Sequence, residues 1–390
     1  MWIRKKENIG LYIHFPFCLN KCPYCGFYSL TPSFSEKEYF SALTKEFLLI
    51  KNFLQTNLNI TDFSLITFYA GGGTPSLFSP YFFERLFEFL YKHSDFIPSE
   101  ITLEANPETL SLEKLKDYKN LGFNRISLGV QSLSEKGLKF LGRIHNVKTS
   151  LKAIEWIQKS GFENYSLDFI FAWKGQGEKT LEKEIKMALK FSPPHFSFYE
   201  LTIEKNTPFE KKYGSHKTWI NEKKLIKLYQ IIENILQKNG YTRYEISNYA
   251  KPGFECKHNL LYWELKPYIG LGPSAVSKVG LFRWQNPPDL KHYYNSLNKN
   301  LLPLKIIEKL DNISLAKEYL FMGLRLKKGI SLKYLKEHFK AYISEESIEL
   351  LIKKGLIEKN KDCITLTFKG KLLHNQIVSF LWDFLDTFKE

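Results

Sequence analysis

The 390-residue sequence predicts an α/β protein whose main part is a partial barrel of six parallel strands. Two observations support this fold class. Over roughly the first two hundred residues, short apolar runs alternate with amphipathic helical stretches, which is typical of parallel strands joined by helical crossovers. Near the C-terminus, three helical stretches precede two short strand-like runs, which indicates a separate α+β domain. The chain is also long for one hydrophobic core, so we expect more than one domain.

Six apolar runs supply the expected strands, at 11–15, 64–70, 100–105, 124–130, 164–171 and 195–202. Amphipathic stretches between and after them predict helices near 35–55, 79–92, 111–119, 147–159, 178–190 and 219–238. A full TIM barrel closes with eight strands, so six predict a partial, TIM-like (β/α)6 barrel. In parallel α/β folds, functional residues gather at the C-terminal ends of the strands.

The charge balance favours anionic partners. Lys and Arg number 56 against 41 Asp and Glu, which gives a formal net charge of +15. Such a surface attracts nucleic acid, membrane headgroups or acidic small molecules. A lysine-rich surface that merely reflects genomic composition is an equally weighted interpretation. The basic residues are scattered in short runs, so no nucleic-acid-binding arm is expected.

The sequence predicts a cytoplasmic location. His14 and Pro16 interrupt the first apolar run, so it does not resemble an export signal. No apolar stretch is long enough for a transmembrane segment, and peripheral membrane contact is left open. The five cysteines do not form a disulfide framework in a chain of this size, which fits a reducing compartment.

Three cysteines follow the first expected strand. Cys18, Cys22 and Cys25 have the spacing C-x3-C-x2-C. Soft thiolates bind zinc, copper(I) or iron–sulfur centres. A structural zinc site usually has four protein ligands, and no fourth Cys or His follows at short spacing. An iron–sulfur cubane on three cysteines would leave one iron open. Zinc remains the alternative.

Polar groups follow the next strands at the same edge of the sheet. Gly71–Gly73 come after the second strand, and Glu104 ends the third. Gln131 and Arg143 follow the fourth, and Asp168 lies on the fifth. Consecutive glycines let the backbone approach a ligand and expose amide donors, although alone they are more often a flexible turn. Together these groups predict one polar ligand, with carboxylates on its hydroxyls and an arginine on its carboxylate.

The combined motifs resemble the radical S-adenosylmethionine (SAM) superfamily, and within it the oxygen-independent coproporphyrinogen III oxidase group. They are C-x3-C-x2-C, Gly-Gly-Gly-Thr-Pro, Glu-Ala-Asn-Pro, Gly-Val-Gln-Ser and Leu-Gly-Arg-x-His, within a match over about residues 10–275. The resemblance implies a radical SAM barrel with a [4Fe–4S] cluster on the three cysteines and SAM on the open iron. It also implies SAM contacts from Tyr12, Tyr24, Gly72, Gly73, Thr74, Glu104, Gln131, Arg143 and Asp168. Cleavage of SAM would require an electron donor.

A second dense stretch contains His258, Asn259, Tyr262 and Trp263. Imidazole is a common axial ligand of haem iron, and aromatic rings suit a flat macrocycle. For a lone histidine, a hydrogen-bonded packing role is the better interpretation. The string His-Asn-x-x-Tyr-Trp, however, is similar to a signature of haem chaperones in this group, which implies haem at His258. Cys256 is either a weaker alternative ligand or a buried thiol.

Residues 310–390 predict a winged-helix-like α+β domain. Helices are expected near 312–324, 331–339 and 344–354, followed by a hairpin over 355–358 and 363–368 and a last helix. The third helix carries Glu345, Glu346 and Glu349, a poor face for phosphates, so we favour a structural cap without nucleic acid. The expected division is a core over 1–240, a haem-motif region packed on it over 241–305, and the C-terminal domain over 306–390.

Residue 27 separates the two leading functions. The oxidases resemble C-x3-C-x2-C-x-C, whereas this chain has Phe27 at the last position. We therefore expect a haem chaperone, with no catalytic residue, that binds haem or a related anionic tetrapyrrole and a client haemoprotein. The alternative is the oxidase, which decarboxylates propionates by radical chemistry, and a third is a zinc-stabilised binding module. Two stretches, Phe171–Gln176 and Gly270–Ser277, depart from the family pattern and lack expected glycine, proline or histidine.

Overall fold

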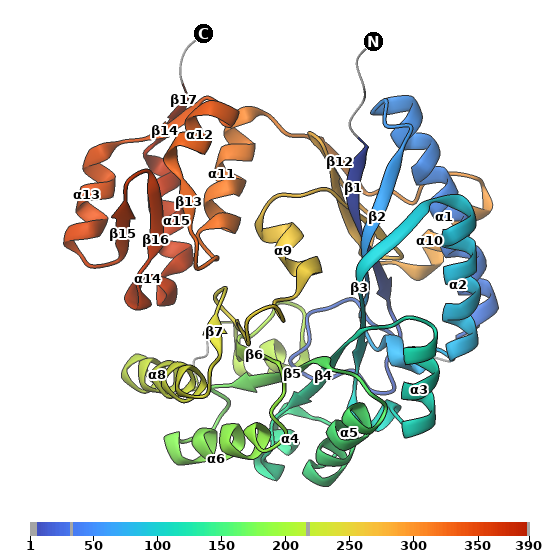
Figure 1. The fold of residues 1–390 in the computed structure, drawn as a ribbon, viewed down its shortest axis with the longest axis horizontal. Coiled ribbons are helices and arrows are strands. Elements are labelled where there is room, and N and C mark those ends of the chain that lie inside the picture. Colours follow the sequence, from blue (N-terminus) through green and yellow to red (C-terminus); the bar gives the residue numbers. More distant parts are fainter. Residues whose placement is uncertain (1–5, 32–33, 216–218, 388–390) are drawn as a thin grey trace.

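The computed structural model describes residues 6–31, 34–215 and 219–387. It confirms the α/β prediction, and all six expected strands form (Figure 1). They are hydrogen-bonded in sequence order and run parallel. Their bounds are β1 Glu7–Phe15, β2 Phe63–Gly72, β3 Asp95–Ala105, β4 Arg125–Gln131, β5 Asn164–Phe171 and β6 His195–Glu200.

Helices cover the outside of this curved sheet (Figure 1). The six expected crossover and following helices are α1 Glu36–Asn57, α2 Pro80–His93, α3 Leu112–Asn120, α5 Val147–Lys159, α6 Glu178–Leu189 and α8 Glu222–Lys238. Serine or asparagine side chains cap the first turns of most of them, as at Ser35 and Asn146. The short helices α4 Glu135–Leu141, α7 Pro208–Tyr213 and α10 Leu290–Asn298 were not predicted.

The two faces of each strand differ, because successive side chains point to opposite sides of a sheet. On β4, Ile126, Leu128 and Val130 are buried in the main hydrophobic core. The alternate residues Arg125 and Ser127 line an internal cavity. The outer face therefore stabilises the fold, while the inner face carries the polar groups.

Residues 241–305 add strands to both edges of the same sheet. β7 Thr242–Arg243 and β8 Asn248–Ala250 extend it beyond β6, and β9 Tyr268–Leu271 runs parallel to β1. β10 Val276–Val279, β11 Phe282–Gln285 and β12 Ile306–Lys309 follow as antiparallel neighbours. Among the described residues, the sheet has twelve strands in the order β12-β11-β10-β9-β1-β2-β3-β4-β5-β6-β8-β7. These short strands were missed, and the region forms part of the sheet that the sequence predicted it would only pack against.

The C-terminal domain has its own hydrophobic core. The order helix, strand, two helices and a hairpin is that of a winged helix, and β13, β16 and β15 form one sheet. The elements are α11 Asn312–Gly323, β13 Ile330–Ser331, α12 Leu332–Phe339, β14 Ala341–Ile343, α13 Glu345–Lys353, β15 Ile357–Asn360, β16 Cys363–Leu366, α14 Phe368–Leu372, α15 His374–Asp383 and β17 Leu385–Thr387. The exact domain boundaries stay a prediction. Among the described residues, no helix is long and apolar enough to cross a lipid bilayer.

Candidate functional site

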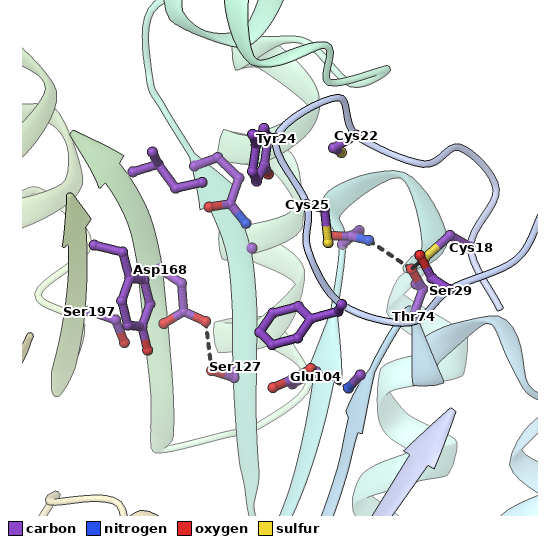
Figure 2. A pocket seen from close by; sticks show the side chains of 18 of the residues that line it. Cys18, Cys22, Tyr24, Cys25, Ser29, Thr74, Glu104, Ser127, Asp168 and Ser197 are labelled. Atoms are coloured by element: carbon purple, nitrogen blue, oxygen red, sulfur yellow. Dashed lines mark hydrogen bonds between the residues drawn. The ribbon is translucent and has the colours of Figure 1, made fainter. Parts of the chain in front are cut away.

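The loops at the C-terminal ends of the strands surround one cavity of about 600 Å³. Figure 2 shows Cys18, Cys22 and Cys25 on one loop, across the cavity from Asp168 and Ser197. Of the residues predicted to bind the cluster and SAM, those that line this cavity are Cys18, Cys22, Tyr24, Cys25, Gly72, Gly73, Thr74, Glu104, Gln131, Arg143 and Asp168. Tyr12 does not line it and instead lines a neighbouring cavity. The structure therefore brings all of these residues except Tyr12 to one cavity, and the SAM contacts, that of Tyr12 included, stay predictions.

The cysteine loop is held against the glycine loop by the backbone. The Gly73 amide donates to the Phe15 carbonyl at 2.7 Å, and the Thr74 amide donates to the Phe17 carbonyl at 2.8 Å. A Cβ atom at Gly73 would lie 2.7 Å from both of those carbonyl oxygens and 3.0 Å from Cys18 Sγ. The Gly73 amide, which the sequence predicted to be exposed for a ligand, is thus engaged in holding the cysteine loop in place.

The three thiols fit a cluster better than a single ion. None of the five cysteines forms a disulfide. Within the described ranges, no group of three or more His, Cys, Asp or Glu side chains could hold one metal ion. A tetrahedral zinc site needs its ligands at about 2.3 Å from one centre, and no such group occurs among the described side chains, so the zinc alternative gains no support. In a cubane, each cysteine binds a different iron, and three thiols facing one cavity suit that geometry.

Arg143 places a positive charge beside the cysteines. Its Nη1 donates to Cys22 Sγ at 3.3 Å, and its Nη2 donates to Asn106 Oδ1 at 2.5 Å. The guanidinium also lies 3.9 Å from Glu108, whose carboxylate contacts His145 at 2.9 Å. Arg143 therefore places a positive charge and a hydrogen-bond donor beside Cys22, where both would stabilise an anionic cluster.

Two carboxylates face the cavity from the strand ends (Figure 2). Glu104 accepts from the Tyr69 hydroxyl at 2.8 Å and from the Gly72 amide at 3.0 Å. Burial raises the pKa of Glu104 to about 7, although these hydrogen bonds oppose the rise. Asp168 accepts from the hydroxyls of Ser127 and Ser166, both at 2.6 Å. The cavity can therefore bind amino groups and hydroxyls along one wall.

Comparisons with known proteins agree with this geometry. The radical SAM superfamily model matches residues 12–188, and the HemN C-terminal domain model matches residues 310–373. The chain is 34% identical over 375 residues to the protein named Heme chaperone HemW in Bacillus subtilis, covering 94% of this chain and 97% of that protein. It is 35% identical over 391 residues to the HemW of Buchnera aphidicola from Schizaphis graminum, covering 97% and 100%. The chain belongs to the HemW family of radical SAM proteins.

A solved structure confirms the fold. Coproporphyrinogen III oxidase (HemN) from Escherichia coli superposes with a TM-score of 0.81 at 20% identity, covering 96% of this chain and 90% of that one. At this identity the likeness shows the architecture alone. Membership of the radical SAM superfamily brings a [4Fe–4S] cluster and SAM as cofactors, and the first cavity holds a donor set that fits them.

The histidine of the His-Asn-x-x-Tyr-Trp motif has both ring nitrogens hydrogen-bonded within the protein. His258 is fully buried on α9 Lys257–Trp263, and burial lowers the pKa of its imidazole to about 3. Its Nδ1 hydrogen-bonds to Thr67 Oγ1 at 2.7 Å, and its Nε2 hydrogen-bonds to the Tyr262 hydroxyl at 2.7 Å. Haem ligation by His258 Nε2 would therefore require its hydrogen bond to Tyr262 to open.

Of the two interpretations of Cys256, an alternative ligand or a buried thiol, the structure supports the buried thiol. Its side chain is fully buried and donates to Glu100 Oε1 at 3.5 Å. Burial raises the pKa of this thiol to about 12. A thiol in this state is a poor ligand, because the thiolate is the form that binds metal.

A second cavity of about 400 Å³ lies beside the cysteine loop and reaches the C-terminal domain. Tyr262 and Trp263 of the family motif line it, with Glu318 and Met322 from α11. Its other aromatic lining residues are Tyr12, His14, Phe27, Tyr28 and Tyr268. Sequence reasoning missed this cavity, and the density of aromatic residues in these separate stretches was its only signal.

Each of the two stretches that depart from the family pattern has a residue other than glycine in left-handed backbone. Ala172 has φ of +63°, and its amide donates to Gln176 Oε1 at 2.7 Å. Ser274 has φ of +70°, and its amide donates to the Pro287 carbonyl at 3.0 Å. Left-handed backbone is unfavourable for residues with a Cβ atom, so tertiary contacts hold both positions.

Proposed function

We propose that this chain is a haem chaperone that holds a [4Fe–4S] cluster and SAM in the first cavity and passes haem to a client haemoprotein. The observation that carries this proposal is the near full-length similarity to proteins named Heme chaperone HemW. Phe27 supports it, because the oxidases resemble a pattern with cysteine at that position, and a phenylalanine cannot supply a fourth thiolate.

Within the first cavity, we assign the cluster to Cys18, Cys22 and Cys25. Glu104 would accept from the amino group of SAM, and Arg143 would supply positive charge near its carboxylate. The remaining proposed SAM contacts are Tyr24, Gly72, Gly73, Thr74, Gln131 and Asp168. When bound, the cluster and SAM supply reductive cleavage of SAM, for which an external electron donor is needed.

The second cavity supports haem binding next to the cluster. Tyr262 and Trp263 give it flat apolar walls, which suit a planar macrocycle. The indole Nε1 of Trp263 is buried and has no hydrogen-bond partner among the described residues. His258 stays a proposed axial ligand, and it becomes available only if its bond to Tyr262 opens.

A paired assay tests the function. The protein is reconstituted anaerobically with iron and sulfide and titrated with haem, and stoichiometric binding with transfer to an apo-haemoprotein is expected. The same preparation is then incubated with coproporphyrinogen III, SAM and a reductant, and no protoporphyrinogen should form. Turnover of coproporphyrinogen would replace the chaperone proposal with the oxidase. Absence of haem binding would contradict the chaperone proposal as well.

A further inference from the structure

The inner end of the first cavity contains an unpaired buried arginine. Arg125 is the first residue of β4, is 2% exposed and lines the cavity. Its Nε has no hydrogen-bond partner, and its guanidinium forms no hydrogen bond or ion pair with any part of the chain that the structure describes. The buried Arg143 and Arg243, in contrast, each lie within 4 Å of a glutamate, at 3.9 and 2.9 Å.

Nearby acids are already engaged by other groups. Glu100 accepts from the backbone amides of Lys257 at 3.0 Å and His258 at 2.9 Å, as well as from Cys256. Asp168 has one hydroxyl on each carboxylate oxygen. Neither carboxylate reaches the guanidinium closely enough for an ion pair, so the charge of Arg125 is left toward the cavity.

The wall behind this site is a completed chain of hydrogen bonds. Since the Ser166 hydroxyl donates to Asp168, its oxygen accepts from His195 Nδ1 at 2.7 Å. His195 Nε2 then accepts from the Tyr244 hydroxyl at 2.9 Å, which accepts from the Cys256 amide at 3.3 Å. His195 is therefore a neutral imidazole with a hydrogen bond on each ring nitrogen. None of these groups accepts a hydrogen bond from Arg125.

Burial lowers the pKa of Arg125, but the nearby Cys256 and Glu100 outweigh burial and raise it, so the guanidinium is charged. Neither of these groups accepts a hydrogen bond from it, so its donors are open to an anion. The fork of a guanidinium matches a carboxylate with two parallel hydrogen bonds. Asn259 of α9 lines the same cavity, and its side-chain amide donates to no described residue. Two unused donor groups thus share the cavity.

We propose that Arg125, assisted by Asn259, binds the carboxylate of an organic ligand at the inner end of the first cavity. A strand rises about 3.3 Å per residue, so Arg125 lies roughly 20 Å along β4 from Gln131 at the cysteine end. The carboxylate that chelates the cluster cannot also reach Arg125. The ligand is therefore a second one, and its carboxylate belongs either to another SAM molecule or to a propionate of a tetrapyrrole.

The test uses the full chain with Arg125→Met and two sets of probes. In the first set, haem and haem dimethyl ester are titrated; in the second, the number of SAM molecules bound per reconstituted chain is measured by equilibrium dialysis. If Arg125 holds a propionate, haem affinity falls about 10- to 100-fold, while affinity for the ester is unchanged. If it holds the SAM carboxylate, the stoichiometry falls by one SAM per chain.

Controls separate a binding role from a structural one. Arg85→Met removes an arginine that packs on Phe40, outside the cavity, and should alter neither probe set. The ligand-free Arg125→Met protein should keep the wild-type fold by circular dichroism, with a modest loss of stability because the buried Glu100 loses a nearby positive charge. Unchanged haem affinity and SAM stoichiometry, or a variant that fails to fold, would overturn the proposal. Only the haem probes rest on the chaperone function; if wild type binds no haem, the SAM probes still test the subsite.

Discussion

Two arginines mark opposite ends of the first cavity, and they differ in what surrounds them. Arg143, at the cysteine end, donates to Asn106 and Cys22 and lies beside Glu108. Arg125, at the inner end, has a satisfied polar wall behind it and no partner of its own among the described residues. The cysteine end is therefore assembled by protein contacts before any ligand binds, whereas the inner end requires a ligand to complete it.

The largest effect is expected from Gly73→Ala, which tests whether protein contacts alone assemble the cysteine end of the cavity. The added Cβ atom would meet two backbone carbonyl oxygens at 2.7 Å, and backbone cannot move aside as the end of a side chain can. We expect the cysteine loop to shift, with near-complete loss of iron after reconstitution and destabilisation by about 1–3 kcal/mol. Iron content and chemical denaturation measure the two effects.

Gly177→Ala is the matched control for that substitution. No atom lies within 4 Å of the position of a Cβ at Gly177, and its φ is −109°. As the N-cap of α6, it should lose at most about 1 kcal/mol and keep full iron content. Normal cluster loading in Gly73→Ala would show that the two loops do not need their close contact.

The pH dependence of SAM binding at Glu104 is the next prediction, and its expected effect is of intermediate size. Burial raises its pKa to about 7 from an ordinary 4.5, so its ionisation is disfavoured by folding. Its contribution to the free energy of unfolding is greatest below pH 4.5 and decreases as the pH rises through about 7. An ionised carboxylate accepts from an amino group better than a protonated one does, so SAM should bind more tightly above pH 7.

Comparison with Glu104→Gln isolates this effect, because other groups that titrate on SAM binding are common to both proteins. The ratio of wild-type to variant affinity for SAM should fall about 5-fold between pH 7 and pH 6, as the ionised fraction of Glu104 falls. Equilibrium dialysis at several pH values measures it. A ratio that stays constant over this range would remove Glu104 from the SAM site while leaving the inner end untouched.

Much of this arrangement could be predicted from the sequence, because it depends on local signals. The apolar runs have the length and spacing of parallel strands, and parallel strands bring their C-terminal ends to one edge. Cys18, Glu104 and Asp168 all follow or end such runs, and the structure brings them to one cavity. Motif order then identified the superfamily.

The remainder depends on contacts between distant segments, which spacing does not encode. Tyr12 and Asp168 both lie on inward-facing positions, but only the curvature of the sheet decides which cavity each one lines. Histidine is a common metal ligand, but in His258 both ring nitrogens are hydrogen-bonded, to Thr67 and to Tyr262. Arg125 has no sequence signal of its own, because its lack of a hydrogen-bond partner depends on the folded surroundings.

Phe27 gives the smallest expected effect, and it separates the first cavity from the second. The ring is 66% exposed and lines both cavities, so little of its area contributes to folding. Phe27→Ala should change the free energy of unfolding by less than about 0.5 kcal/mol. If haem packs against the aromatic second cavity, losing one ring should weaken haem binding by about 3- to 10-fold without altering SAM binding.

Tyr81→Ala is the comparison variant, since Tyr81 is 64% exposed on α2 and lines neither cavity. It should leave haem and SAM affinity at wild-type values. Equal haem affinity in the two variants would exclude Phe27 from the haem surface. A parallel loss of SAM affinity in Phe27→Ala alone would instead place the contribution of this ring in the first cavity, because only there does it face the cysteines.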